Sequence, residues 1–257
     1  MKILILGGTA DGRHLAAALH ESGCTVVYSI AGLVRQPALE CEVISGGFTQ
    51  FGGLTTYLKK QSVAAVLDVT HPYAKVMSFT ARESTQLCGI PYWRFHRPAW
   101  ASAADDSWLH YQDWPELLKD LQLKKNVFLT AGQLPDVALQ AFEIFGQKGQ
   151  KQILRTAVEP KHELPVSMTW HKAIGPFSLE HERAIMVNNQ VDALVTKNSG
   201  GTSMQVKLWV ARELSIPVLM FTRPDIPDAD KEFVSQLECQ RFIDQWLKAY
   251  SPANWVL

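Results

Sequence analysis

Short apolar runs bounded by glycine or proline alternate with longer amphipathic segments along the chain. The short runs have the length of buried strands, and the longer segments have the spacing of helices that pack on a sheet. Expected strands are 2–6, 25–30, 64–69, 92–95, 127–130, 193–196 and 218–221, and expected helices are 12–22, 53–61, 73–88, 114–122, 179–188 and 202–214. Alternation of this kind predicts an α/β fold with open parallel sheets.

A weak internal repeat divides the chain into two such sheets. Residues 69–70 and 195–196 both read Val-Thr and lie 126 positions apart. The same offset relates Ile90-Pro91 to Ile216-Pro217, Phe95 to Phe221, and Arg97-Pro98 to Arg223-Pro224. With a two-residue shift, 2–8 overlies 126–132, so each half begins with a strand that enters a glycine turn. We therefore expect an N-terminal dinucleotide-binding domain over 1–100 and a C-terminal substrate or cofactor domain over 101–257.

Composition narrows the class of protein. Of the 257 residues, 47% are hydrophobic, and 25 basic residues balance 25 acidic ones, so the chain lacks the basic excess of a nucleic-acid binder. No run reaches the roughly 18 apolar residues of a membrane helix, and the N-terminal run is too short for a signal peptide. The four cysteines form no CxxC pair, so we expect reduced thiols, no metal site and a cytoplasmic protein.

The first strand ends in a glycine turn that is a candidate phosphate site. Gly7 and Gly12 occupy the first and third glycine positions of G-x-G-x-x-G, whereas Thr9 replaces the second. Glycines let the backbone approach a ligand, and the start of the next helix favours an anion. We expect Gly7, Gly8, Thr9 and Arg13 to hold a dinucleotide; the alternative is a tight turn that binds nothing.

The end of the second strand indicates which dinucleotide is bound. Sites that prefer NAD usually end this strand with an acid for the ribose hydroxyls, and this chain has none there. It has Ser29, Gly32 and Arg35, a hydroxyl and a cation that suit a 2′-phosphate. NADP(H) is therefore favoured over NAD(H), the alternative being that Arg35 points to solvent.

Two further strand ends carry polar residues. Thr70, His71 and Tyr73 follow the strand at 64–69, at the sheet edge where ligands of open α/β folds bind. Thr70 is a candidate cofactor contact, and His71 and Tyr73 are candidate substrate contacts or proton donors, unless they are structural. In the second half, Lys197 with 199–201 (Ser-Gly-Gly) has the ingredients of an anion cradle, but its spacing differs from a Walker A loop.

Taken together, these motifs resemble the precorrin-6A reductase family, which includes the cobalt-precorrin-6A reductases. The segments that carry the resemblance occur in family order: 7–9, 13–16, 29–32, 46–48, 68–74, 94–100, 197–201 and 223–224. The resemblance implies two Rossmann-like domains with a cofactor and a tetrapyrrole in the cleft between them. It also implies hydride transfer from a pyridine nucleotide to the C18=C19 bond of the macrocycle, giving precorrin-6B or its cobalt form.

The substrate implied by the resemblance assigns roles to individual residues. A polycarboxylated corrinoid precursor needs cations, for which Lys197, Ser199, Gly200, Gly201 and Arg223 are the candidates; a salt bridge at a strand end is the alternative for Arg223. His71 is the candidate proton donor, although water could serve.

The chain departs from the family pattern at two places. Leu33 stands where an arginine is common, and 130–133 reads Thr-Ala-Gly-Gln in place of a Thr-Gly-Arg turn. The first departure bears on the choice of nucleotide, and the second on one cationic contact to the substrate.

Three other classes of protein share parts of this pattern. A single-domain dehydrogenase or epimerase commonly has a Tyr-x-x-x-Lys pair, but Tyr57 and Tyr73 are followed four residues later by Gln61 and Met77. A dinucleotide-sensing protein would not require the second glycine-rich loop. Two-domain nucleotide-sugar transferases also have paired Rossmann-like sheets but are usually longer. The sequence leaves open the oligomeric state and whether the substrate carries cobalt.

Overall fold

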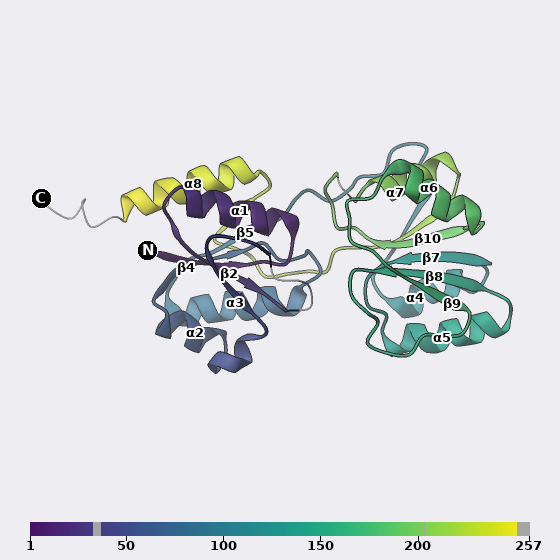
Figure 1. Cartoon of the computed structure of the whole chain (residues 1–257), viewed down its shortest axis with the longest axis horizontal. Helices are drawn as coiled ribbons and strands as arrows, with labels where there is room; N and C mark the ends of the chain where they lie inside the picture. Colours follow the sequence, from purple (N-terminus) through teal and green to yellow (C-terminus); the bar gives the residue numbers. More distant parts are fainter. Residues whose placement is uncertain (33–36, 203, 251–257) are drawn as a thin grey trace, which may run out of the picture. The chain divides into compact units, whose positions relative to one another are not determined.

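The computed structural model describes residues 1–32, 37–202 and 204–250. The described chain forms two compact units, one of Met1–Pro98 with Pro224 onwards and the other of Ala99–Arg223. Each unit is a six-stranded parallel sheet with helices on both faces (Figure 1). This confirms the expected α/β class with two parallel sheets.

The first unit is built around β1, the N-terminal strand. Its sheet has the order β12-β5-β4-β1-β2-β3. The strands are β1 (Lys2–Leu6), β2 (Thr25–Ile30), β3 (Glu42–Ser45), β4 (Val63–Asp68), β5 (Tyr92–Phe95) and β12 (Lys231–Phe233). The helices α1 (Ala10–Glu21) and α8 (Gln236–Ala249) pair on one face, and α2 (Leu54–Lys60) and α3 (Lys75–Cys88) on the other, with the 3-10 turn η1 (Phe48–Phe51) before α2 (Figure 1).

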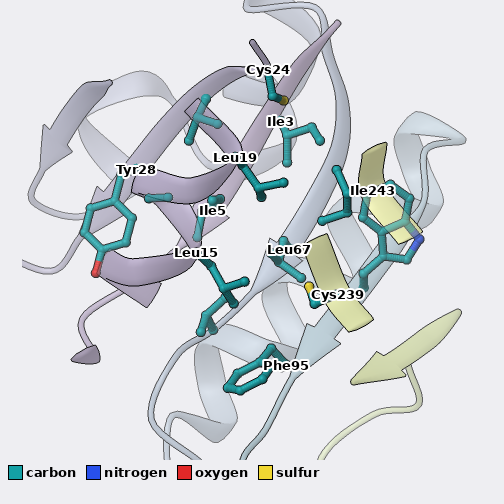
Figure 2. Packing of buried hydrophobic residues seen from close by; sticks show 14 of the residues in the cluster. Ile3, Ile5, Leu15, Leu19, Cys24, Tyr28, Leu67, Phe95, Cys239 and Ile243 are labelled. Atoms are coloured by element: carbon teal, nitrogen blue, oxygen red, sulfur yellow. The ribbon is translucent and has the colours of Figure 1, made fainter. Parts of the chain in front are cut away.

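Burial on both faces explains why the first strand is apolar throughout. Successive side chains of a strand point to opposite faces, so Ile3 and Ile5 enter one layer while Leu4 and Leu6 enter the other. The layer of Ile3 and Ile5 also contains α8, which contributes Ile243 (Figure 2). Residues from the two ends of the chain therefore share one core.

The second unit repeats this architecture. Its sheet has the order β6-β11-β10-β7-β8-β9. The strands are β6 (Trp108–Tyr111), β7 (Asn126–Thr130), β8 (Lys151–Thr156), β9 (Met168–Lys172), β10 (Ala193–Lys197) and β11 (Val218–Phe221). The helices α4 (Trp114–Leu121) and α5 (Asp136–Gln147) pair with each other, as do α6 (Leu179–Asn188) and α7 (Val206–Glu213).

Strand order supports the internal repeat read from the sequence. Position by position, β5, β4, β1, β2 and β3 of the first sheet correspond to β11, β10, β7, β8 and β9 of the second, in the same chain order. The sixth strand breaks this order. β6 follows β5 in the chain yet pairs with β11, whereas β12 follows β11 yet pairs with β5. The first unit is thus completed by β12 and the helix after it, which follow β11 of the second unit. The second unit is completed by β6 and the helix after it, which follow β5 of the first unit.

This exchange corrects the expected extent of the second domain at its C-terminal end. Residues 101–257 were expected to form one domain, but the described residues from Pro224 onwards belong to the first unit. The physical reason is burial: Phe233, Cys239 and Ile243 complete the core of the first unit, and each is at most 1% exposed.

All seven expected strands and six expected helices are present, although the last helix begins at Val206 instead of 202. The four cysteines are free, and Cys24, Cys41 and Cys239 are buried. Among the helices of the described ranges, none is long and apolar enough to cross a membrane.

Candidate functional site

The order of the first sheet identifies its ligand-binding edge. From β1 the chain proceeds to β2 and β3 on one side, and then returns to β4 on the other side. In open α/β sheets ligands bind at such a switch point, outside the carboxyl ends of the strands. The residues that follow β1 and β4 are therefore the candidate site of this unit.

Thr9 joins the two strand ends at this point. Its hydroxyl accepts a hydrogen bond from Gly12 N at 3.0 Å, which caps α1, and donates to Val69 O at 2.8 Å. The cap fixes the start of a 12-residue helix whose first N–H groups have no acceptor within the helix. Gly8 has φ of +107°, and a Cβ there would meet nothing within 4 Å. The turn thus has the open backbone and helix start that a phosphate site needs.

Tyr28 of β2 packs against this turn and explains why position 7 is a glycine. A Cβ on Gly7 would lie 2.2 Å from the Tyr28 ring, so only glycine fits at that position. The Tyr28 hydroxyl accepts a hydrogen bond from Gly8 N at 2.9 Å. Burial raises the pKa of this phenol above its ordinary value, which keeps it protonated. Gly7 therefore serves packing, and the Gly8 amide is already bonded within the protein.

Arg13, expected to bind the dinucleotide together with the glycine turn, is exposed on α1. The residues expected to distinguish NADP(H) from NAD(H) are only partly placed. Ser29 is buried, and its carbonyl accepts from Gly7 N. Gly32 has φ of +78°, and a Cβ there would lie 2.9 Å from Ser45 Oγ. Leu33 and Arg35 lie outside the described residues.

Asp68, at the end of β4, is the centre of a buried polar cluster. The side chain is 0% exposed and accepts hydrogen bonds from Thr70, Ser78 and Tyr92. The Tyr92 hydroxyl in turn accepts from Arg94 at 3.0 Å. Burial and the neighbouring Asp68 raise the pKa of Tyr92 well above its ordinary value. Asp68 was not among the expected site residues, although an acid at the end of a buried strand is a visible signal.

His71 and Tyr73 lie in the turn between β4 and α3. Tyr73 N donates to His71 Nδ1 at 3.3 Å, and the two rings are 5.5 Å apart. Because Nδ1 accepts this bond, the neutral imidazole carries its proton on Nε2. The His71 side chain is exposed.

In the second unit, the loop after β10 is held from two sides. The Asn198 side chain bonds both the N–H and the carbonyl of Trp100, at 2.8 and 3.0 Å, and Trp100 Nε1 donates to Gly201 O at 2.7 Å. Arg223 donates from Nε to Asn198 O at 3.0 Å and from Nη2 to Ser199 O at 3.3 Å. The structure thus brings Arg223 to the loop that contains Lys197, Ser199, Gly200 and Gly201. It shows Arg223 bonded to the loop's carbonyls.

Two cations near this loop were not expected. Lys207 of α7 is 3% exposed, and its Nζ lies 3.2 Å from Thr130 Oγ1 and 5.6 Å from the centre of the Trp100 ring. Arg155, near the end of β8, forms a bidentate ion pair with Glu182. Thr130, Arg155 and Lys197 all lie at the carboxyl ends of their strands.

Burial lowers the pKa of two lysines in this region. It lowers the pKa of Lys197, and it lowers that of Lys207 to about 7, with Arg155 adding to the effect and Glu182 opposing it. Sequence reasoning missed both Lys207 and Arg155. Lys207 was missed because a lysine in an amphipathic helix usually faces solvent. The signal for Arg155 was its place directly after the apolar Ile153-Leu154.

The turn after β7, where the sequence departs from a Thr-Gly-Arg pattern, bonds a neighbouring loop. Gln133 Nε2 donates to Glu159 O and its Oε1 accepts from Lys161 N, both at 3.0 Å. A Cβ on Gly132 would lie 3.9 Å from Lys197 Nζ. Lys197 therefore occupies space beside the turn that lacks the arginine. Over the described residues, no group of three or more His, Cys, Asp or Glu side chains could hold a metal ion.

Comparison with known proteins gives a consistent assignment. The family model described as precorrin-6x reductase CbiJ/CobK matches residues 2–243. A precorrin-6A reductase of Rhodococcus erythropolis is 38% identical over 89% of this chain and 91% of its own. A cobalt-precorrin-6A reductase of Priestia megaterium is 29% identical over 87% and 91%. A solved structure described as CobK precorrin-6A reductase superposes with a TM-score of 0.83 at 30% identity, covering 98% of this chain and 97% of its own.

Proposed function

Because the chain belongs to the precorrin-6x reductase CbiJ/CobK family, we propose that it reduces precorrin-6A in cobalamin biosynthesis with a nicotinamide dinucleotide as the reductant. The observation that carries the proposal is the charge at the carboxyl edge of the second sheet. Arg155, Lys197 and Arg223 gather there, and Glu182 pairs with Arg155. An excess of cations around a fixed loop suits a substrate with several carboxylates.

The first unit supplies the place for the dinucleotide. Thr9 caps α1 and ties it to the segment after β4, so the turn and the helix start are fixed before a ligand binds. The bound nicotinamide would supply a hydride for one carbon of the C18=C19 bond, and a proton completes the other carbon. His71 is the proposed source of that proton, and water is the alternative.

The reductant is proposed to be NADPH in preference to NADH. Described residues at the end of β2 include Ser29, Ile30 and Gly32 but no acid, so nothing there matches the carboxylate that binds the ribose hydroxyls of NAD. Arg35→Ala should then weaken NADPH more than NADH in a titration of each nucleotide, whereas an equal loss for both would contradict a phosphate-reading role.

A metal-free macrocycle is the proposed substrate, because identity to the Rhodococcus precorrin-6A reductase is 38% and to the Priestia cobalt-precorrin-6A reductase 29%. We place the enzyme in the cytoplasm, where its four free thiols stay reduced.

An anaerobic assay tests the reaction. Purified protein is mixed with precorrin-6A, or with its cobalt form, and either NADPH or NADH. We expect nucleotide oxidation coupled to a spectral change of the tetrapyrrole, fastest with NADPH and the metal-free substrate. Nucleotide binding without turnover of either tetrapyrrole would indicate a dinucleotide-sensing protein instead.

A lysine variant tests the assigned substrate contact. Lys197→Met removes a charge that would pair with a substrate carboxylate, so we expect the KM for the tetrapyrrole to rise about 10-fold or more. The KM for the nucleotide should stay within about twofold of the wild-type value, a difference that corresponds to less than a single hydrogen bond. Lys148→Met, at an exposed residue that ends α5, is the matched control and should change neither constant.

A further inference from the structure

Every hydrogen bond found at the Asp68 side chain is donated to it. Oδ1 accepts from the Thr70 amide at 3.0 Å and from the Thr70 hydroxyl at 2.6 Å. Oδ2 accepts from the hydroxyls of Ser78 and Tyr92, both at 2.7 Å. A carboxylate has no proton to offer, so each of the three hydroxyls directs its own proton at Asp68.

Of these three hydroxyls, that of Thr70 borders the candidate dinucleotide site. The Tyr92 hydroxyl donates to Asp68 and also accepts from Arg94, so both of its hydrogen-bonding roles are taken within the protein. Ser78 of α3 is only 2% exposed, so it is closed to a ligand. Thr70 lines a small pocket at the switch point, together with Thr9, Pro72 and neighbouring residues of the β1, β4 and β5 ends. With its proton committed to Asp68, Thr70 presents only lone pairs to a ligand.

Two neighbouring groups of this pocket also accept hydrogen bonds, and Arg97 adds a cation to its wall. The Thr9 hydroxyl gives its proton to Val69 O, so it too offers a ligand only an acceptor. Asp11 adds a carboxylate to the pocket wall and is held by Gln236 at 2.8 Å and by Arg97 at 3.4 Å. The acceptors Thr9, Asp11 and Thr70 suit a ligand group that donates, such as a hydroxyl or an amide.

The fold indicates which part of a dinucleotide would reach this wall. In sheets of this type the adenosine half is read at the end of the second strand, on one side of the switch point. Thr70 follows β4, on the other side of the switch point from β2.

We infer that Asp68 is a positioning residue that fixes the Thr70 hydroxyl as an acceptor for a ribose hydroxyl or carboxamide N–H of the nicotinamide half. The inference rests on the proposed dinucleotide-dependent function and assigns one subsite within it.

Binding of whole and fragment ligands tests the inference. Dissociation constants are measured by calorimetry for NADPH and for 2′,5′-ADP, which has the adenosine half alone; NADH and ADP form the second pair. Thr70→Val removes the hydroxyl with little change of shape, and we expect it to weaken NADPH about 3- to 10-fold, the range of one hydrogen bond. Binding of 2′,5′-ADP should be unchanged. Thr70→Ser should restore NADPH binding, and Thr80→Val, at an exposed threonine of α3, is the matched control.

Asp68→Asn tests the role of the carboxylate. An amide accepts at one atom only, so the hydroxyls around it must reverse, and NADPH should weaken without loss of 2′,5′-ADP binding. A Thr70→Val protein that binds NADPH like the wild type would overturn the inference alone, as would equal weakening of NADPH and 2′,5′-ADP. Wild-type protein that binds neither NADPH nor NADH would overturn the proposed cofactor, and this inference with it.

Discussion

Lys207 places an ammonium group in the interior of the second unit. It is 3% exposed, and Thr130 Oγ1 is the hydrogen-bond acceptor found for it among the described residues. Arg155 lies close enough to add repulsion, which Glu182 offsets in part. Burial of a charge with so few partners is unfavourable, and the group responds with a pKa lowered to about 7.

The lowered pKa of Lys207 predicts how stability depends on pH. An unfolded lysine titrates near 10.4, so between pH 7 and 10 the unfolded chain binds the proton that the folded chain has lost. This group therefore makes the wild type more stable as pH rises through that window. Lys207→Met lacks this contribution. Its free energy of unfolding minus that of the wild type should therefore be largest at pH 7. This difference in the free energy of unfolding should fall by about 1–3 kcal/mol between pH 7 and pH 10.

Urea unfolding of the two proteins at pH 7, 8.5 and 10 measures this difference, and other groups that titrate cancel in the comparison. Lys148→Met should show no pH-dependent difference, because Lys148 is exposed. A constant difference for Lys207→Met across the window would show that the lysine stays charged in the folded protein.

The ion pair of Arg155 and Glu182 makes a second residue-scale prediction. Both side chains are at most 5% exposed, and the guanidinium also packs 3.8 Å from the centre of the Phe177 ring. Removal of one partner leaves a buried charge, so Glu182→Gln and Arg155→Met should each destabilise by about 3–5 kcal/mol. The double variant should cost clearly less than the sum of the two, as measured by chemical unfolding. Additive losses would mean that the two charges do not compensate each other.

At the scale of elements, the β1–α1 turn combines packing with a candidate binding function. Gly7→Ala would place a methyl group 2.2 Å from the Tyr28 ring, so we expect a loss of about 1–3 kcal/mol from overpacking. In a Tyr28→Val background the ring is absent, and the same substitution should cost much less. A double-mutant cycle by urea unfolding measures the coupling. Equal costs in both backgrounds would show that Gly7 is required for another reason.

Sequence patterns predicted the central strands better than the edges. Central strands such as Lys2–Leu6 and Val218–Phe221 are covered on both faces, so they are apolar and were placed with their full bounds. The edge strands β3, β6, β9 and β12 have exposed positions, as in Lys231-Glu232-Phe233, and left no apolar run to detect. β8 was missed for a related reason, because Gln152 and Arg155 interrupt it although both are buried.

The candidate site was predictable in its location and much less so in its contacts. Glycine turns and polar residues after buried strands are local signals, and they indicated the Gly7–Thr9 turn, Thr70 and the loop from Lys197. The partners of these residues come from distant elements. Tyr28 reaches Gly8 across 20 residues, and Trp100 reaches Asn198 across 98. Such pairings depend on how the strands and helices pack, which no local pattern states.

At the scale of the whole molecule, two halves with one strand order have diverged in charge. Strand β4 of the first unit ends in the buried acid Asp68, whereas β10, at the corresponding place in the second sheet, ends in Lys197. Arg155 adds a buried cation to the second unit, and Lys207 adds a buried amine whose pKa is lowered to about 7. Under the proposed function this asymmetry separates two tasks, with hydrogen-bond acceptors for a dinucleotide in one unit and cations for a polycarboxylated substrate in the other.

The exchanged sixth strands predict which segments lose stability when a residue near the C-terminal end of the chain is substituted. Ile243 of α8 is 0% exposed in the core of the first unit, and Ile243→Ala should cost about 2–5 kcal/mol there. Hydrogen exchange measured by mass spectrometry should then accelerate in β1, β5 and α1, more than 140 positions earlier in the chain, and much less in β7 and β8. Leu208→Ala, in the core of the second unit, should give the reverse pattern. An Ile243→Ala protein whose exchange rises mainly within 99–223 would contradict the assignment of the C-terminal helix to the first unit.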